Sequence, residues 1–376
     1  MNEKQADPAV EKKPMTRVEE IVNARKFTRT NIITLLRSEG ADMQFLINEA
    51  LQEKLSRIGN ERHLRGLIEY SNVCRKNCLY CGLRRDSKQH PYVLSDEDVL
   101  KCAQLAVAYH YGSVAIQCGE RTDREFTDKI ESLVRQIKKL SNGKLGITLS
   151  CGEQTREVYA RWREAGAHRY LLRIETSNRE LYYRIHPNDP QHSFEQRLAC
   201  LDYLKELDYQ TGTGVMVGLP TQSVEHLADD ILYFQAQDFA MIGLGPYIPH
   251  PQTPLWEKRE MIPSPEARLH LTLKVLAVTR LMMSEINMVA ATAMQTLDPL
   301  GREKAVVAGA NVIMPNLTPT EYREGYFIYP DKACVKDKPE DCDSCLDARM
   351  RMIGHKILYN SWGDSKAYLK KIGLKE

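Results

Sequence analysis

The feature that most constrains the fold is a regular alternation of short apolar runs and amphipathic helical stretches between about residues 64 and 315. Eight runs have the composition of strands, and they are GLIEYS, SVAIQCG, LGITLSC, RYLLRIET, TGTGVMVG, MIGLGPYI, NMVAAT and ANVIMP. Helical periodicity fills most of the intervals between them. Near-continuous apolar strands that alternate with helices indicate a parallel sheet covered on its outside. Eight such units predict an α/β fold of the complete (β/α)8 TIM-barrel type, with an open doubly wound sheet as the structural alternative.

The strand and helix pattern leaves a segment at each end of the chain. Residues 1–20 are polar and are expected to form a loose tail. Residues 21–63, with helical spacing of apolar residues over 29–58, predict N-terminal helices packed on the barrel. We place the barrel itself at residues 64–320 and a cysteine-containing C-terminal segment at 321–376.

Charge and hydropathy exclude several classes of partner. The chain has 52 Lys and Arg against 50 Asp and Glu, so the formal charge of +2 gives no reason to expect binding to nucleic acid or to an anionic membrane. No window approaches 18 uncharged apolar residues, and the polar N-terminus lacks the apolar core of a signal peptide. The sequence therefore predicts a cytoplasmic protein.

Ten cysteines in such a chain need an explanation, because a reducing cytoplasm disfavours structural disulfides. Cys74, Cys78 and Cys81 follow the first predicted strand directly, at a spacing that lets three thiolates face one centre from a single loop. Structural zinc sites normally take four ligands, and iron–sulfur clusters are normally held by four cysteines. Three thiolates in one loop suit a 4Fe–4S cluster with one iron left for an external ligand. A zinc site and incidental cysteines remain the alternatives.

This cysteine spacing, with Tyr80 just before the third cysteine, resembles that of the radical S-adenosylmethionine enzymes. The resemblance implies a 4Fe–4S cluster whose open iron binds S-adenosylmethionine and cleaves it reductively to a 5′-deoxyadenosyl radical. The sequence Gln-Cys-Gly-Glu that ends at Glu120 resembles the Gly-Gly-Glu element of the family, which holds the methionine ammonium. Cys118 replaces the first glycine of that element, whereas Gly119 keeps the second.

Three further residues match cofactor-binding positions of the family. Arg173 and Glu175 end the fourth predicted strand, and Glu175 resembles the acidic residue that accepts hydrogen bonds from the ribose hydroxyls. Arg197 resembles an arginine that pairs with the methionine carboxylate, for which a bidentate guanidinium is suited. Ordinary salt bridges are the structural alternative for each residue, and their joint placement favours the functional interpretation.

The resemblance narrows to the FeFe-hydrogenase maturases of the HydE type over roughly residues 30 to 360. It implies action on a small organometallic substrate, an iron species that carries cysteine, carbon monoxide and cyanide, during assembly of the diiron subcluster of the H-cluster. It also implies HydG and HydF as partner maturases and an electron donor such as ferredoxin or flavodoxin. A related radical enzyme that acts on an organic amino acid, methylornithine synthase-like or sulfur-inserting, is one alternative. A scaffold that carries clusters without radical turnover is the other.

Positions that match the HydE substrate cavity supply hydroxyls, one cation and several packing residues. They are Thr148, Ser150, Arg169, Met241, Thr292, Met294, Tyr326 and Tyr329. A small anionic ligand in an otherwise apolar cavity needs such groups for its orientation. Ala291 and Ile174 stand where some HydE proteins have Thr and His.

A second cysteine group lies in the C-terminal segment. Cys334, Cys342 and Cys345 resemble the auxiliary cluster site of some HydE proteins, which implies a second iron–sulfur cluster, either 2Fe–2S or 4Fe–4S. A zinc site and unligated thiols are the alternatives. Because the surrounding KDKPED sequence is charged, we expect an exposed site. The resemblance implies that this second cluster does not carry the chemistry.

Overall fold

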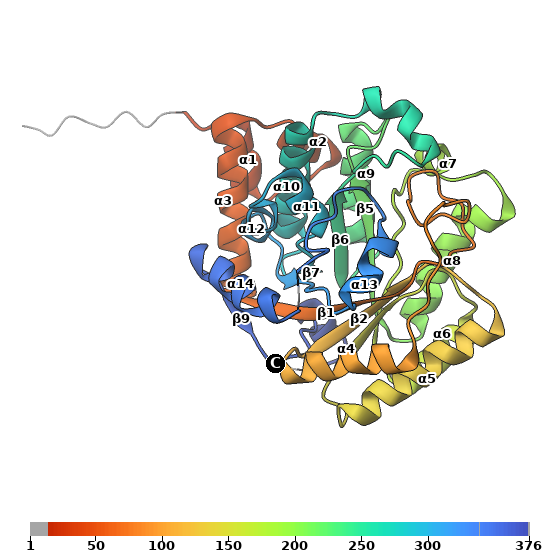
Figure 1. Cartoon of the computed structure of the whole chain (residues 1–376). Coiled ribbons are helices and arrows are strands. Elements are labelled where there is room, and N and C mark those ends of the chain that lie inside the picture. Colours follow the sequence, from red (N-terminus) through yellow and green to blue (C-terminus); the bar gives the residue numbers. More distant parts are fainter. Residues whose placement is uncertain (1–13, 338, 375–376) are drawn as a thin grey trace, which may run out of the picture.

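The computed structural model describes residues 14–337 and 339–374, with only the backbone described over 339–344. Within these residues one curved sheet forms the centre of the molecule (Figure 1). Its strands are β1 (Glu61–Ser71), β2 (Ser113–Cys118), β3 (Gly146–Ser150), β4 (Arg169–Leu171), β5 (Gln210–Val217), β6 (Met241–Pro246), β7 (Asn287–Met288), β8 (Val312–Ile313) and β9 (Lys356–Leu358). All eight predicted strands are present, although β4, β7 and β8 are shorter than their apolar runs.

The strand order corrects the expectation of a complete, closed barrel. The strands run β7-β6-β5-β4-β3-β2-β1-β8, and every neighbouring pair is parallel. Each step in the order from β7 to β1 is one strand, without the reversal that a doubly wound sheet requires. In the described part of the chain no ladder joins the edge strands β7 and β8, which meet only at a parallel bridge between Val289 and Val312. The structure is therefore an eight-stranded parallel half-barrel with an incomplete seam, because its last two strands are too short to pair along their length.

Helices surround this sheet. They are α1 (Arg17–Ala24), α2 (Arg29–Leu36), α3 (Gly40–Arg57), α4 (Asp96–Ala108), α5 (Arg124–Leu140), α6 (Arg156–Ala165), α7 (Arg179–Ile185), α8 (Phe194–Glu206), α9 (Val224–Ala236), α10 (Pro265–Met282), α11 (Thr292–Leu297), α12 (Gly301–Val307), α13 (Thr320–Arg323), α14 (Pro339–Met352) and α15 (Lys366–Lys371). Of these helices, α4, α8, α9, α10 and α11 contact the strands of the sheet directly. Three short 3-10 helices are η1 (Pro190–His192), η2 (Pro254–Met261) and η3 (Glu324–Tyr326). None of the helices described is both long and apolar enough to cross a membrane.

The N-terminal helices pack on one side of the half-barrel. Helix α3 lies against α10 and α1, and α2 lies against α9 and α10 (Figure 1). Helix α1 begins inside the segment that was expected to be a loose tail, because Thr16 and Glu19 form a capping box at its start. Residues 1–13 lie outside the described part of the chain.

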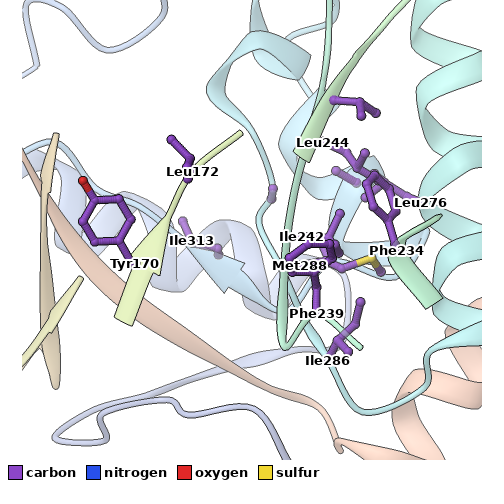
Figure 2. Packing of buried hydrophobic residues seen from close by; sticks show 14 of the residues in the cluster. Tyr170, Leu172, Phe234, Phe239, Ile242, Leu244, Leu276, Ile286, Met288 and Ile313 are labelled. Atoms are coloured by element: carbon purple, nitrogen blue, oxygen red, sulfur yellow. The ribbon is translucent and has the colours of Figure 1, made fainter. Parts of the chain in front are cut away.

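The core lies between the sheet and the helices. Figure 2 shows Phe234 of α9 and Leu276 of α10 beside Ile242 of β6 and Met288 of β7, and all four side chains are fully buried. Buried apolar area of this kind supplies most of the free energy of folding. Strands fixed by this core carry loops at their carboxyl ends. The candidate site residues lie on those loops.

The C-terminal segment returns to the opposite end of the sheet. Strand β9 pairs in parallel with the start of β1, with Glu61 opposite Lys356. The chain then enters the amino-terminal end of the half-barrel, where Arg65 and Asn287 donate hydrogen bonds to the Gly363 carbonyl at 3.1 and 2.8 Å. This segment closes the end of the barrel that faces away from the cysteine loop.

Candidate active site

The loop between β1 and α4 carries Cys74, Cys78 and Cys81 and is fixed by contacts with several barrel loops. The Cys74 Sγ accepts a hydrogen bond from the Glu120 N–H at 3.2 Å, which joins this loop to the end of β2. The Leu79 N–H donates to the Ile185 carbonyl at 3.0 Å. A methyl group on Gly119 would lie 2.3 Å from the Val73 carbonyl oxygen, so only glycine allows the two loops to approach this closely.

The three thiols influence one another. Burial raises the pKa of all three, and at Cys78 the neighbouring Cys81 and Cys74 raise it further. For Cys81 the pKa rises to about 12. A metal that binds these residues as thiolates must therefore displace their protons.

The arrangement of the donors fits a cluster better than a single zinc ion. Among the described residues, no three His, Cys, Asp or Glu side chains converge on one point that could hold an ion. A cubane binds each thiolate through a different iron, so its ligands need to be close together without meeting at one centre. Cys74, Cys78 and Cys81 lie near enough for Cys81 and Cys74 to raise the pKa of Cys78, and they are the residues that would hold a 4Fe–4S cluster.

Next to the cysteine loop, four buried charged side chains form one ion-pair network. Glu120 follows β2, Glu153 follows β3, Lys76 lies between two of the loop cysteines, and Arg197 lies on α8. The Lys76 Nζ is 2.8 Å from Glu153 Oε2 and 3.3 Å from Glu120 Oε1. The Arg197 Nε donates to Glu153 Oε1 at 2.5 Å, and the Glu153 N–H donates to Glu120 Oε2 at 2.9 Å. The structure therefore brings the predicted Glu120 and Arg197 together through Lys76 and Glu153, which sequence reasoning missed.

The two carboxylates of this network differ electrostatically. Burial and the neighbouring Glu153 raise the pKa of Glu120. Burial also opposes ionisation of Glu153, but the Arg197 and Lys76 cations outweigh it and lower the pKa of Glu153. Glu153 is therefore the more firmly ionised member, and it is the carboxylate that Arg197 contacts directly. The only sequence signal for Glu153 and Lys76 was their position. Glu153 lies at a strand end, and Lys76 lies inside the cysteine motif.

Arg173 and Glu175 form a bidentate ion pair just after β4. The Arg173 Nε and Nη2 donate to the two Glu175 oxygens, each at 2.9 Å. Glu175 has φ of +66°, a backbone conformation that residues other than glycine seldom adopt. The hydrogen bond from the Glu175 N–H to the Gly214 carbonyl, 2.9 Å long, holds it in place against β5. Such conformations persist where the surrounding structure fixes them, and they occur often at functional sites.

A cavity of about 340 Å³ lies inside the half-barrel, next to these residues. Nine of its lining residues were predicted as site residues, and they are Tyr80, Cys81, Thr148, Ser150, Arg173, Glu175, Met241, Thr292 and Tyr329. The cysteine loop, the Arg173–Glu175 pair and the expected substrate positions therefore face a common space. Apolar residues with a few polar groups are typical of a ligand cavity.

Three predicted substrate residues do not line this cavity. Arg169 lies beneath it, where its Nε donates to Thr148 Oγ1 at 3.1 Å and its Nη1 reaches Asp364 Oδ1 at 2.6 Å. Tyr326 is buried, with the Lys332 Nζ 5.2 Å from its ring centre. Met294 is fully buried in the core.

Three charged lining residues were missed by sequence reasoning. Glu69 of β1 and Lys332 of the C-terminal segment form a buried ion pair at the cavity wall. Arg65, also on β1, donates to Met241 Sδ at 3.1 Å. They were missed because charged residues inside an apolar strand, or far along the chain, carry no local pattern that marks a cavity.

The C-terminal cysteines are only partly described. Cys334 has φ of +64°, and its Sγ is 3.5 Å from the Arg302 Nη2. Cys345 is exposed on α14. The side chain of Cys342 lies outside the described residues.

A parallel half-barrel whose first strand is followed by three cysteines at this spacing, next to buried acidic and basic residues at the following strand ends, defines a radical S-adenosylmethionine enzyme. The model of the radical SAM superfamily matches residues 68–234. The chain is 45% identical over 316 residues to the FeFe hydrogenase maturase subunit HydE of Thermotoga maritima, which covers 84% of this chain and 87% of that protein. The chain belongs to the radical SAM superfamily and, within it, to the HydE family.

Two solved structures share the fold. The crystal structure of methylornithine synthase (PylB) superposes with a TM-score of 0.78 at 22% identity, over 92% of this chain and 98% of that one. The crystal structure of HydG, a maturase of the FeFe-hydrogenase, gives a TM-score of 0.74 at 21% identity, over 91% of this chain and 75% of that one. At these identities the likeness concerns the fold alone. Membership of the superfamily implies a 4Fe–4S cluster and S-adenosylmethionine as cofactors.

Proposed function

We propose that this chain is a maturase that acts on a cysteine-ligated iron carbonyl cyanide species during assembly of the diiron subcluster of FeFe hydrogenase. The observation that carries the proposal is the 45% identity to the HydE subunit of Thermotoga maritima over most of both chains. The internal cavity supports it, because a reactive carbon radical must be kept from solvent while it meets its substrate.

The residues of the site divide into three roles in this proposal. Cys74, Cys78 and Cys81 hold the cluster. Glu120 binds the amino group of S-adenosylmethionine and Arg197 its carboxylate, while Tyr80, Gly119, Arg173 and Glu175 shape the rest of the cofactor site, with Glu175 toward the ribose. When bound, the cluster supplies the electron that cleaves S-adenosylmethionine to methionine and a 5′-deoxyadenosyl radical.

The cavity wall suits a small anionic substrate. Arg65, Arg173 and Lys332 bring cationic groups to the cavity, and Thr148 and Ser150 add hydroxyls. Arg173 and Lys332 are already paired with carboxylates, whereas the guanidinium of Arg65 donates to a carbonyl and to a thioether. Arg65 is thus the cation best placed to stabilise a ligand that carries negative charge.

We also propose a second iron–sulfur cluster at Cys334, Cys342 and Cys345, which the reaction does not require. Two observations support a site of this kind. Burial raises the pKa of the Cys334 thiol, but the Arg302 guanidinium beside it opposes this rise and favours the thiolate, and Cys345 is exposed to an incoming cluster. Neither Cys334 nor Cys345 lines the cavity, which favours an accessory role.

The proposed reaction takes place in the reducing cytoplasm and depends on other proteins. HydG supplies the substrate, HydF receives the product, and a ferredoxin or flavodoxin donates the electron. The relationship to HydE is what supports each of these assignments.

Two measurements on anaerobically reconstituted protein test the proposal. Electron paramagnetic resonance of the reduced protein should show a cubane signal whose g-values shift when S-adenosylmethionine is added. Hydrogenase apoprotein, incubated with HydG and HydF, should then gain hydrogen-evolving activity only when this chain is present. Glu175→Gln should abolish that gain, whereas Glu157→Gln, an exposed position on α6, should not. A shifted signal without hydrogenase activation would favour a radical enzyme that acts on an organic amino acid, and an unshifted signal would favour a cluster scaffold.

A further inference from the structure

The network of Lys76, Glu120, Glu153 and Arg197 has no net charge, although all four side chains are buried. Lys76 and Glu153 are only 3% and 4% exposed, and Glu120 and Arg197 are 5% and 7% exposed. Leaving a buried charge without a partner costs far more free energy than a surface ion pair contributes. A ligand that pairs with Glu120 and Arg197 must therefore leave the charges of Lys76 and Glu153 neutralised.

The geometry meets this condition for a ligand that carries both an ammonium and a carboxylate. Lys76 contacts both carboxylates, but its shorter contact is to Glu153, 2.8 Å against 3.3 Å. When a ligand ammonium pairs with Glu120 and a ligand carboxylate pairs with Arg197, Lys76 and Glu153 still neutralise each other. The buried charge is therefore balanced both before and after an α-amino acid group binds.

Glu153 and Lys76 also fix the orientation of the two binding groups. Arg197 donates from Nε to Glu153 and from Nη1 to the Arg173 carbonyl, and its Nη2 makes no hydrogen bond to the described residues. Nη2 is thus the donor left for a ligand carboxylate. Glu120 accepts hydrogen bonds from the backbone N–H of Glu153 and from the half-exposed Arg75, and it pairs with Lys76 at 3.3 Å. Lys76 and Glu153 are thus the buried residues that contact both binding groups or join them.

We propose that Lys76 and Glu153 are positioning residues for S-adenosylmethionine: as a mutually compensating ion pair, they hold Glu120 and Arg197 for the α-amino acid portion of the cofactor. This inference rests on the proposed function, in which Glu120 and Arg197 bind that portion. Removing either residue alone unbalances the buried charges. Without Lys76, the carboxylates of Glu120 and Glu153 lie together, and without Glu153, Lys76 and Arg197 share Glu120, which the half-exposed Arg75 also contacts. The two positions should therefore depend strongly on each other.

A double-mutant cycle on the anaerobically reconstituted full chain tests this dependence. The affinity for S-adenosylmethionine is measured by anaerobic calorimetry with the cluster oxidised, so that no turnover is involved, for wild type, Lys76→Met, Glu153→Gln and the double variant. Each single change should weaken binding by about tenfold or more, since a buried charged hydrogen bond is lost. The double variant should bind much more tightly than the product of the two single effects predicts. Lys76→Arg, which keeps the charge, should recover part of the affinity.

Controls separate this inference from the proposed function and from loss of structure. Affinities are related to the iron content of each variant, and Glu53→Gln, a buried carboxylate of α3 that pairs with Arg25, should bind as wild type does. Wild-type protein that fails to bind S-adenosylmethionine would overturn the proposed function. Wild-type binding with independent, multiplying single effects, or losses that only follow lost iron, would overturn the positioning role alone.

Discussion

Arg169 and Asp364 are 195 residues apart in the chain and form an ion pair inside the amino-terminal end of the half-barrel, with 2.6 Å between Nη1 and Oδ1. Asp364 Oδ1 also accepts hydrogen bonds from the Gln210 amide at 2.7 Å and lies 3.1 Å from the His168 Nε2. The C-terminal segment thus neutralises a fully buried arginine that β4 alone leaves without a counter-ion. The pair ties the end of the chain to the floor of the cavity.

Asp364→Asn should destabilise the protein, because it removes one partner of a buried ion pair, a change that typically costs about 3–5 kcal/mol. Differential scanning calorimetry should show a melting temperature lower by several degrees. Asp238→Asn is the matched control, since Asp238 pairs with Lys371 where both side chains are exposed. Equal melting temperatures for the two variants would mean that Asp364 does not stabilise the fold.

The contribution of Asp364 should also depend on pH. Burial opposes ionisation, but the hydrogen bond from His168 and the Arg169 guanidinium hold the pKa of Asp364 well below its usual value. A carboxylate with a lowered pKa in the folded state stabilises the protein above its unfolded pKa of about 3.9, and this stabilisation is lost as the pH falls below it. The difference between wild type and Asp364→Asn should therefore be full at pH 6 and shrink below about pH 4.

The fold was largely predictable because each strand and helix has its own local pattern. The helices at Arg124–Leu140, Arg179–Ile185 and Val224–Ala236 lie in intervals between the predicted strands, where helical periodicity was expected. The completeness of the barrel was not predictable, because apolar runs show that β7 and β8 exist but not how far they pair. Strand β9 and the Asp364 segment carried no such pattern, since their position depends on contacts with residues far away in the sequence.

Gly119→Ala should disrupt the cysteine loop. The added methyl group would meet the Val73 carbonyl oxygen and the Cys74 side chain, which cannot move without displacing a cluster ligand. We expect a clearly lower iron content after reconstitution and a weaker cubane signal. Gly143→Ala is a stringent control, because Gly143 has φ of +74° but nothing within 4 Å of an added methyl group. That variant should lose some stability from backbone strain and keep its iron, and similar iron loss in both would contradict the role of Gly119.

Cys78→Ala should remove the barrel cluster and all cleavage of S-adenosylmethionine, since two thiolates from one loop do not hold a cubane. The measurements are iron content and the yield of 5′-deoxyadenosine. Cys102→Ala provides the comparison, because Cys102 is a buried cysteine on α4 whose thiol donates to the Leu317 carbonyl at 3.1 Å. Normal 5′-deoxyadenosine formation by Cys78→Ala would exclude Cys78 as a ligand.

Glu120 and Glu175 could be predicted as candidate site residues because each belongs to a motif at a strand end, and Arg197 on α8 because it resembles an arginine of the family. Lys76 and Glu153 were missed because their role depends on partners that only the folded chain brings together. Arg169 was expected to contact substrate, but its guanidinium lies below the cavity against Asp364. A sequence shows which residues end a strand, whereas the direction of a long side chain depends on the charge that lies opposite it.

Cys345→Ala should leave most of the 5′-deoxyadenosine yield intact. Cys345 is exposed on α14 and does not line the cavity, so its loss should remove only iron bound by the C-terminal segment. Iron analysis should show a partial decrease, while the signal that shifts with S-adenosylmethionine persists. Complete loss of cofactor cleavage would show that the C-terminal site takes part in the chemistry.

Asp230→Asn should change how stability depends on pH near neutrality. Asp230 lies fully buried on α9 and accepts hydrogen bonds from the Ser177 N–H and hydroxyl, both at 2.6 Å, which fixes the segment after Glu175. Burial raises the pKa of Asp230 to about 7. The folded protein therefore keeps this proton up to about pH 7, whereas the unfolded chain releases it near pH 3.9. The wild-type protein should lose stability from this group as the pH rises from about 4 to 7.

The asparagine variant cannot ionise, so its melting temperature should rise relative to wild type between pH 5 and pH 8. Asp128→Asn serves as the control, because the Arg161 guanidinium lowers the pKa of Asp128 and keeps its carboxylate ionised throughout this range. Its melting curve should run parallel to that of wild type. Parallel curves for Asp230→Asn as well would show that Asp230 is already ionised in the folded protein at pH 5, and that the Ser177 hydrogen bonds outweigh the cost of burying its charge.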